Sequence, residues 1–486
     1  MTDALNIPLE NSYAEDLPGF SVSWSGEMVP KPEIALFNDA LAAELGLEAL
    51  NSPEGAQILT GAKTLPASKP LAMAYAGHQF GNFSPQLGDG RALLLGEVMK
   101  DGLRFDLHLK GSGKTPFSRR GDGKAVIGPV LREYIMGEAM HALGIPTTRA
   151  LAACTTGEDI LRQNGREPGA VLARIASSHI RVGTFQFFAA RQEVDRLKQL
   201  ADYTIARHDP DLAGQEDRYL QLLIRVADRQ AKLMAQWMAV GFVHGVMNTD
   251  NMTISGETID YGPCAFMDTY DPQTLFSSID HAGRYAYGRQ PLMAQWNLAR
   301  FAESLLDLIA PDDADKAIQL AGDVVNDFMG KHLRYWQDLI RAKIGLHGQG
   351  DDDQKLLSDL FQLLEGADVD YTSFFRNLPD AEQTAALFAE PSAITAWHAR
   401  WQNRIAQESR STDAVFTTMN TVNPLYIPRN HMVESALQEA TDTGDLTQAR
   451  RLIDVLSNPF TEQHNAETYT RPAPENSAPY RTFCGT

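Results

Sequence analysis

Two short segments near the middle of the chain carry the strongest structural signal: Phe242-Val243-His244-Gly245-Val246-Met247-Asn248-Thr249-Asp250-Asn251 and, shortly after it, Ile259-Asp260-Tyr261-Gly262. The first segment follows a helical pattern, in which apolar residues recur at i, i+3, i+4 and i+7 from 220 to 238 before Gly241 ends it. Asn251 offers an amide oxygen and Asp260 a carboxylate, the hard oxygen ligands that Mg²⁺ takes together with phosphate and water. The two segments therefore predict a site for Mg²⁺ or Mn²⁺ at Asn251 and Asp260.

The spacing of these segments is that of protein kinases, which carry H-R-D-x-x-x-x-N followed by D-F-G. His244 precedes Asn251 by the kinase interval, and Asp260-Tyr261-Gly262 exchanges one aromatic residue for another. Either segment alone would read as ordinary turn chemistry. Val246 occupies the place of the kinase catalytic aspartate, and valine accepts no proton. Either the protein transfers no group, or another residue does this work, and Asp250 is the candidate.

The rest of the chain has the order of a small β-rich lobe followed by a larger helical one. Strand patterns with turn residues between them cover 91–98, 104–109, 149–155 and 170–175, and one helix opens near Gly128-Pro129 and ends at Gly144. Helical patterns dominate from about residue 185. We expect an α+β, protein-kinase-like, two-lobed fold with an N-terminal extension (1–70), a β-rich N-lobe (71–180), a helical C-lobe (181–345) and a C-terminal helical extension and tail (346–486).

The overall composition limits the classes of partner. The 486 residues include 62 Asp and Glu against 43 Lys and Arg, a net charge of -19, which disfavours a nucleic acid or an anionic membrane as partner. No apolar run approaches the ~20 residues of a membrane span. The acidic first residues lack the pattern of a signal or transit peptide, so we expect a cytoplasmic protein. Three cysteines, Cys154, Cys264 and Cys484, are too few for a disulfide framework or a zinc site.

Basic residues gather locally against this acidic background. Seven lie between 104 and 132, and Arg174 and Arg181 follow where the β-rich zone meets the helical one. In a kinase this junction lines an adenine slot, whereas two guanidinium groups suit a polyphosphate better. A nucleotide held in that way would be reversed and would transfer its nucleotidyl group. Surface salt bridges are the alternative interpretation of both arginines.

Three further features bear on phosphate binding. A glycine-rich turn with Gly88 and Gly90, next to Arg91, precedes an apolar run and could bring backbone N–H groups to phosphate oxygens. A lysine at the end of a strand pattern, Lys110, is followed by a glutamate on the next helix, Glu133, which is the order of the kinase lysine and its glutamate partner. The alternative interpretation is that both are solvated surface charges. The run 111–115 is not a Walker P-loop, because the glycine five residues before Gly113 is missing.

Taken together, these motifs resemble the selenoprotein O family of protein adenylyltransferases, which have a pseudokinase fold. The resemblance extends over most of the chain and includes 76–81, 86–91, 109–116, 118–123, 178–185, 244–251, 260–262 and 423–431. It implies transfer of AMP, or UMP, from ATP or UTP to Ser, Thr or Tyr hydroxyls of proteins, from a flipped nucleotide. It implies Asp250 as proton acceptor, Asn251 and Asp260 as metal ligands, and nucleotide contacts from Gly88, Gly90, Arg91, Lys110, Asp122, Gly123, Arg174 and Arg181.

The resemblance also concerns the C-terminus. Eukaryotic members carry a selenocysteine there, and Cys484 looks like its counterpart, so a Cys264–Cys484 disulfide is a hypothesis, with two unlinked thiols as the alternative. Two other functions stay open. His244-Gly245 resembles the H-G-D of small-molecule phosphotransferases, which Val246 disfavours. The second alternative function is a non-catalytic nucleotide-binding scaffold, which the presence of metal-ligand residues disfavours.

Overall fold

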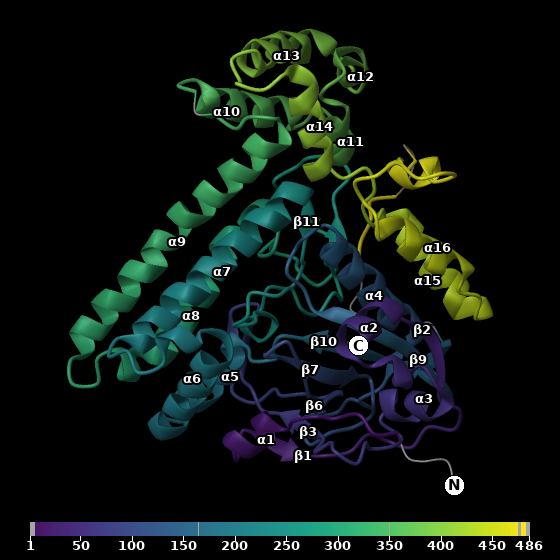
Figure 1. Cartoon of the computed structure of the whole chain (residues 1–486), viewed down its shortest axis with the longest axis vertical. Helices are drawn as coiled ribbons and strands as arrows, with labels where there is room; N and C mark the ends of the chain where they lie inside the picture. The colour runs from purple at the N-terminus through teal and green to yellow at the C-terminus, as the bar shows by residue number, and fades with distance from the viewer. Residues whose placement is uncertain (1–4, 164, 349, 475–477, 483–486) are drawn as a thin grey trace.

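The computed structural model describes residues 5–163, 165–348, 350–474 and 478–482. It is a mixed α+β structure, with an antiparallel sheet in the N-terminal part and a largely helical C-terminal part (Figure 1). The expected α+β class is confirmed at this level. Among the described residues, no helix combines the length and apolar character needed to cross a membrane.

One large sheet organises the N-terminal part. Its strands lie in the order β1 (Ser21–Ser23), β3 (Leu71–Met73), β6 (Ala92–Lys100), β7 (Leu103–Lys110), β10 (Gly165–Ala176), β9 (Arg149–Arg162) and β2 (Glu33–Phe37), and β8 (Ala125–Val126) pairs with β10. The four predicted strands are present, and the last two are longer than expected because they continue as a hairpin beyond their apolar halves. Strands β1 and β2, from before residue 70, belong to the same sheet.

Helices cover this sheet and continue the chain. The sheet region carries α1 (Ser12–Asp16), α2 (Asp39–Leu45), α3 (Pro53–Leu59) and α4 (Ile127–Ala142). The central helices are α5 (Val182–Ala189), α6 (Val194–His208), α7 (Arg218–Val240), α8 (Gln290–Ile309) and α9 (Ala314–Lys343). The last ones are α10 (Asp353–Leu364), α11 (Tyr371–Asn377), α12 (Ala381–Ala386), α13 (Pro391–Ile405), α14 (Thr412–Val422), α15 (Asn430–Thr443) and α16 (Thr447–Leu456).

The two sequence-predicted helices end as their glycines indicate. Helix α4 stops just before Gly144 (φ 75°), and α7 is capped by Gly241 in the left-handed conformation (φ 75°) that glycine adopts without a side-chain clash. Immediately after Gly241 the chain enters β11 (Phe242–Val243), which pairs with β12 (Ala265–Phe266). This pairing brings the two segments of the predicted metal site together at the end of α7.

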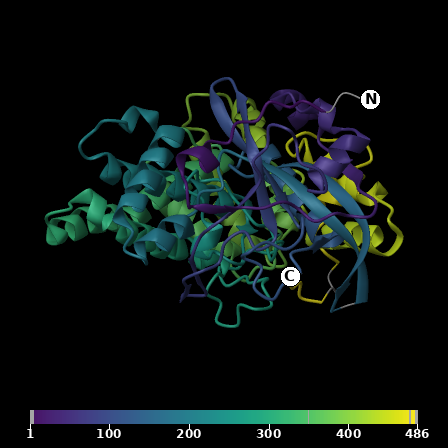
Figure 2. The ribbon, with the colours of Figure 1, turned by 90° about the horizontal axis from the view of Figure 1, so that it is seen from below.

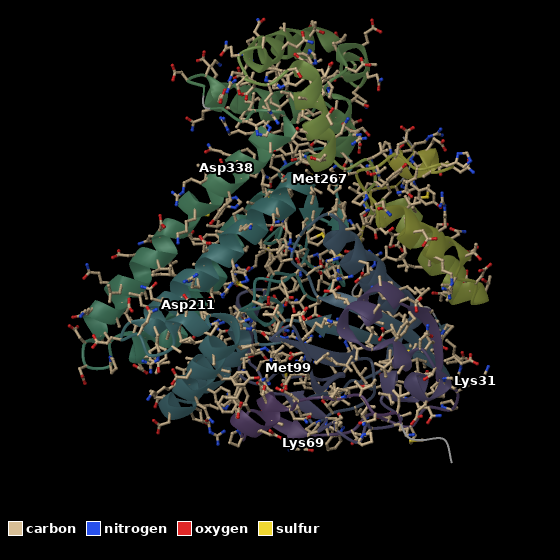
Figure 3. All side chains as sticks on the ribbon, viewed as in Figure 1. Lys31, Lys69, Met99, Asp211, Met267 and Asp338 are labelled. Atoms are coloured by element: carbon tan, nitrogen blue, oxygen red, sulfur yellow. The ribbon has the colours of Figure 1, made fainter. Side chains whose placement is uncertain are left out.

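The buried core joins the sheet to the helices. One large cluster of buried apolar side chains includes α4, the inner faces of α5 to α8, and α15 and α16. Helices α10 to α14 have a separate core around Trp397 and Trp401. Seen from below, the yellow C-terminal helices lie on the same side of the molecule as the purple N-terminal helices (Figure 2). A hydrogen bond from Arg450 of α16 to the Ala35 carbonyl in β2 joins these two regions. Charged side chains such as Asp338 on α9 cover the outer surfaces (Figure 3).

Candidate active site

His244 ties the two central segments to each other. Its Nε2 lies 2.9 Å from the Ile259 carbonyl oxygen, and its backbone N–H donates to Gln290 Oε1 across 2.9 Å. The ring is fully buried, and burial lowers the pKa of His244, so the imidazole is neutral at ordinary pH. His244 therefore fixes the residue that immediately precedes Asp260.

Asp260 lies where three cationic side chains meet. Its carboxylate is 2.6 Å from Lys110 Nζ, 2.9 Å from Arg174 Nη1 and 3.1 Å from Arg181 Nη1. Burial alone would raise the pKa of Asp260, but these cations hold it well below its usual range. Asp260 also has a left-handed backbone (φ 64°), which is uncommon outside glycine.

The cations around Asp260 also face other carboxylates, because Arg174 lies 3.8 Å from Glu133 and Arg181 lies 3.9 Å from Asp89. Lys110 pairs closely with Glu133 of α4, in the order expected from the sequence. Arg174 and Arg181 are only 2% and 3% exposed, so they are buried rather than surface salt-bridge residues. Buried guanidinium groups are good receptors for phosphate oxygens, because their planar forks donate two hydrogen bonds at once.

Asp250 has one carboxylate oxygen without a partner. Its Oδ2 accepts a hydrogen bond from Gln79 Nε2 at 3.2 Å, whereas Oδ1 is buried and has no hydrogen-bond partner among the described residues. Burial raises the pKa of Asp250 to about 6. An unpaired, oriented carboxylate oxygen is what a general base needs to accept the proton of a hydroxyl.

Close backbone packing holds Asp250 in place. A Cβ at Gly77 would lie 2.5 Å from Asp250 Oδ1, so only glycine fits there. Gly77 begins the hairpin of β4 (Gly77–Gln79) and β5 (Asn82–Ser84), which docks on the loop before Asn251. The His78 N–H donates to Thr249 Oγ1 at 2.7 Å, and the Phe80 N–H donates to Asn248 Oδ1 at 3.0 Å.

Asn251 and Asp260 offer the oxygen types that a divalent cation prefers, and both carboxylate oxygens of Asp260 are paired with cationic side chains in this structure. The Asn251 amide nitrogen donates to the Val246 carbonyl at 3.0 Å, which leaves the amide oxygen for another ligand. Asp260 supplies a carboxylate. Two hard oxygens from the protein, completed by phosphate and water, are the usual coordination of Mg²⁺ in nucleotide enzymes.

The glycine-rich turn lies beside the strand that ends in Lys110. The Gly111 N–H donates to the Arg91 carbonyl at 2.7 Å, so Arg91 is a neighbour of Lys110. Gly88 (φ 89°) packs against Phe117, where a Cβ would lie 2.4 Å from the ring, and Ser118 Oγ bonds the Gly90 carbonyl. The turn and residues 115–118 are thus packed as one unit.

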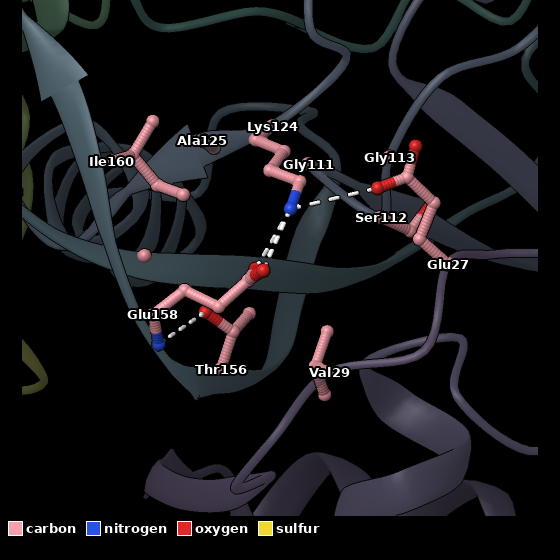
Figure 4. Close-up of a pocket in the computed structure, with 11 residues that line it drawn as sticks. Glu27, Val29, Gly111, Ser112, Gly113, Lys124, Ala125, Thr156, Glu158 and Ile160 are labelled. Carbon is pink, nitrogen blue, oxygen red and sulfur yellow. Dashed lines mark hydrogen bonds and ion pairs between the residues drawn. The ribbon is translucent and has the colours of Figure 1, made fainter.

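Asp122 and Gly123 lie on a separate loop. Arg162 of β9 pairs with Asp122 at 2.8 Å, and Lys124 pairs with Glu158 at 2.8 Å and with Glu27 at 3.5 Å beside a small cavity (Figure 4). The Gly113 N–H donates to the Gly123 carbonyl, which closes the loop on itself. Within the described ranges, no hydrogen bond or ion pair joins Asp122 to the group around Asp260, so their shared role in nucleotide binding stays a prediction.

Comparison with known proteins identifies the family. The model of the family described as Protein adenylyltransferase SelO matches residues 3–457. This chain belongs to the SelO family. It is 54% identical to the "Protein nucleotidyltransferase YdiU" of Cereibacter sphaeroides over 489 residues, which cover 99% of this chain and all of the relative.

Other relatives with the same name match as broadly. The protein from Chromobacterium violaceum is 55% identical over 469 residues, with 95% of this chain and 98% of the relative covered, and the protein from Mycolicibacterium smegmatis is 52% identical over 497 residues, with both chains fully covered. The family inferred from the motifs is confirmed.

A buried polar layer behind the SelO-family site was not predicted. His108 Nδ1 accepts a hydrogen bond from Arg174 Nε at 3.3 Å, and its Nε2 lies 3.3 Å from Asp89 Oδ2. His108 stacks on His179 at 4.0 Å, and His179 Nδ1 lies 2.9 Å from Asp106. The strand 104–110 contained a usable signal, because polar residues at 106, 108 and 110 alternate with leucines and must share one face.

Gln79 was also missed as a site residue. It belongs to the segment 76–81, which entered only through the family resemblance, and its contact with Asp250 joins residues 171 positions apart. The redox hypothesis concerns Cys264, which is buried and has a thiol pKa raised by burial to about 12. Cys484 lies outside the described residues, so the Cys264–Cys484 disulfide stays a prediction.

Proposed function

We propose that this SelO-family chain transfers AMP, or UMP, from ATP or UTP to Ser, Thr or Tyr hydroxyls of proteins and releases pyrophosphate. The family model and the names of the relatives support protein nucleotidyl transfer. The observation that carries the proposal is the proximity of two chemical groups: a buried cluster of cations around Asp260 and, beside it, the Asp250 Oδ1, which has no hydrogen-bond partner among the described residues.

In this proposal the nucleotide lies with its terminal phosphates on the cationic side. Lys110, Arg174 and Arg181 bind them, Glu133 holds Lys110, and the backbone around Gly88 and Gly90, with Arg91, contacts the same triphosphate. Asp122 and Gly123 contact the remainder of the nucleotide. The reversed nucleotide then points its α-phosphate toward Asp250, with its terminal phosphates at the buried Arg174 and Arg181.

Asp250 then accepts the proton of the acceptor hydroxyl. Val246 has no group that could do so, and the Asp250 Oδ1 has no competing hydrogen bond within the described residues. Asn251 and Asp260 would hold Mg²⁺ or Mn²⁺, which supplies charge neutralisation at the phosphates. The acceptor oxygen attacks the α-phosphorus, and the bond to the bridging oxygen breaks so that pyrophosphate leaves.

The fold we propose for this chemistry is protein-kinase-like and two-lobed, with an N-terminal extension (1–70), a β-rich lobe (71–180), a helical lobe (181–345) and a C-terminal extension (346–486). The order of sheet and helices and the Lys110–Glu133 pair support it. Transfer of label from the α-phosphate of ATP to protein tests the function. A scaffold would bind nucleotide without transfer, and a small-molecule phosphotransferase would transfer the γ-phosphate.

A further inference from the structure

A row of aromatic and cationic side chains lies beside Asp250, outside the nucleotide contacts. Trp296 of α8 is flanked by two guanidinium groups, with Arg284 Cζ at 4.7 Å and Arg300 Cζ at 5.1 Å from its ring centroid. His78 of the β4–β5 hairpin packs edge-on against Trp296 at 5.2 Å, and Phe83 packs on His78 at 4.9 Å.

This row is close to the candidate base. Gly81, at the tip of the hairpin, packs against Arg284. A Cβ added at Gly81 would lie 3.6 Å from the Arg284 Cζ. Two residues earlier in the same hairpin, Gln79 bonds Asp250. Tyr285, the neighbour of Arg284, donates its hydroxyl to Asn248 Oδ1 at 2.8 Å. An acceptor hydroxyl at Asp250 would therefore place its flanking residues near Arg284.

Arg284 lacks an acidic partner in the described part of the chain. Its Nε is buried without a hydrogen-bond acceptor, whereas Arg300 pairs with Glu303. The carboxylate of Asp280, four residues before Arg284, accepts hydrogen bonds from the backbone N–H groups of Arg284 and Tyr285 at 2.9 and 2.7 Å. A guanidinium that is held on an aromatic ring and has no carboxylate partner within the described residues can pair with a carboxylate of a bound protein.

Exposed apolar side chains extend the same surface. Phe83 is 40% exposed, and Leu292, one helical turn before Trp296 on the same face of α8, is 52% exposed. We call the surface formed by His78, Phe83, Arg284, Leu292 and Trp296 the acceptor rim. Aromatic residues and arginine around an apolar centre are typical of protein-binding surfaces.

We propose that the acceptor rim binds the protein segment that carries the acceptor hydroxyl, and that Arg284 selects acceptors with an acidic side chain near that hydroxyl. This inference rests on the proposed function and adds a class of substrate to it. The charge of the whole chain, -19, would repel acidic proteins, so Arg284 supplies a local attraction at the position where the acceptor must bind.

The test uses synthetic peptides with a single hydroxyl acceptor, flanked at each neighbouring position in turn by Glu, Ala or Lys, together with α-labelled ATP and the full chain. We expect the wild type to label the best Glu peptide at least about tenfold more efficiently, as kcat/KM, than its Lys counterpart, which corresponds to about 1.4 kcal/mol. Arg284→Glu should reverse the preference, and Arg284→Gln should abolish it without reversal. Arg334→Glu, the same charge change on an exposed residue of α9, should leave it intact.

The outcomes separate this inference from the proposed function. Labelling of peptides by the wild type without a Glu preference overturns the role of Arg284 and leaves nucleotidyl transfer standing. An equal loss on all peptides in both Arg284 variants, with weaker ATP binding, would make Arg284 a nucleotide contact and would also overturn the inference. No α-label on any peptide or protein contradicts the proposed function itself.

Discussion

Gln79 and Asp250 are joined by a hydrogen bond of 3.2 Å from Gln79 Nε2 to Asp250 Oδ2, whereas Asp250 Oδ1 has no partner in the described part of the chain. Gln79 belongs to the β4–β5 hairpin, and this hairpin is bonded to Thr249 and Asn248. The loop that carries Asp250 therefore also holds the hairpin that orients the Asp250 carboxylate. The orientation of this carboxylate depends on contacts between distant parts of the chain.

Gln79→Leu should therefore lower kcat for nucleotidyl transfer by about tenfold or more, because the carboxylate loses the group that orients it. ATP affinity should change little, since within the described residues no hydrogen bond joins Gln79 to Lys110, Arg174 or Arg181. Single-turnover transfer of α-label and ATP titration measure the two quantities. Gln57→Leu, on the exposed side of α3, is the matched control, and equal kcat in both variants would contradict the positioning role.

Gly77→Ala should reduce transfer more severely, because the added Cβ would lie 2.5 Å from Asp250 Oδ1 and 3.0 Å from its Cγ. The base or the hairpin must move to relieve this clash. Gly322→Ala is the control: Gly322 lies within α9 with no atom within 4 Å of an added Cβ, so alanine should stabilise the fold by about 0.5–1 kcal/mol. Activity assays and urea unfolding of both variants check this pair, and full activity of Gly77→Ala would rule out the tight packing.

Asp260→Ala should lower transfer by at least about 100-fold, because the metal loses its carboxylate ligand and three cations lose their anion. Wild-type and variant proteins should be compared over a range of Mg²⁺ and Mn²⁺ concentrations, with circular dichroism to confirm folding. Undiminished transfer by the folded variant would exclude Asp260 as a metal ligand.

The half-buried His208 should make stability depend on pH. Burial lowers the pKa of His208 to about 3, against roughly 6.5 in an unfolded chain. Between these values the unfolded state binds the proton and the folded state does not, so stability from His208 is lost as pH falls below about 6.5, by about 1.4 kcal/mol per pH unit. His208→Asn should remove this contribution.

Urea unfolding at pH 7.5, 6.5 and 5.5 measures the effect. The difference in unfolding free energy between the wild type and His208→Asn should shrink toward pH 5.5, because the other titrating groups are common to both proteins. A constant difference across this range would contradict the neutral state of the half-buried His208.

Local patterns were sufficient for some parts of this structure. The end of α7 could be predicted because a left-handed cap depends on a single residue, Gly241. The strand around His108 could be predicted because polar and apolar residues alternate along it. The Lys110–Glu133 pair was expected from motif order, whereas the contacts of Asp260 with Lys110, Arg174 and Arg181 were not. Contacts such as Gln79 with Asp250, or Arg284 with Trp296, depend on how distant segments pack, and no local spacing encodes them. The extra length of β9 and β10 was missed because their distal halves are polar.

The most direct test of nucleotidyl transfer compares two labels. The protein is incubated with a protein mixture, Mg²⁺ and ATP labelled at either the α- or the γ-phosphate, and covalent label on protein is counted, with Asp250→Asn as the inactive reference. We expect stable label from α-labelled ATP, none from γ-labelled ATP, and none with the variant. Label from the γ-phosphate alone, or α-label that persists undiminished in Asp250→Asn, would contradict this expectation.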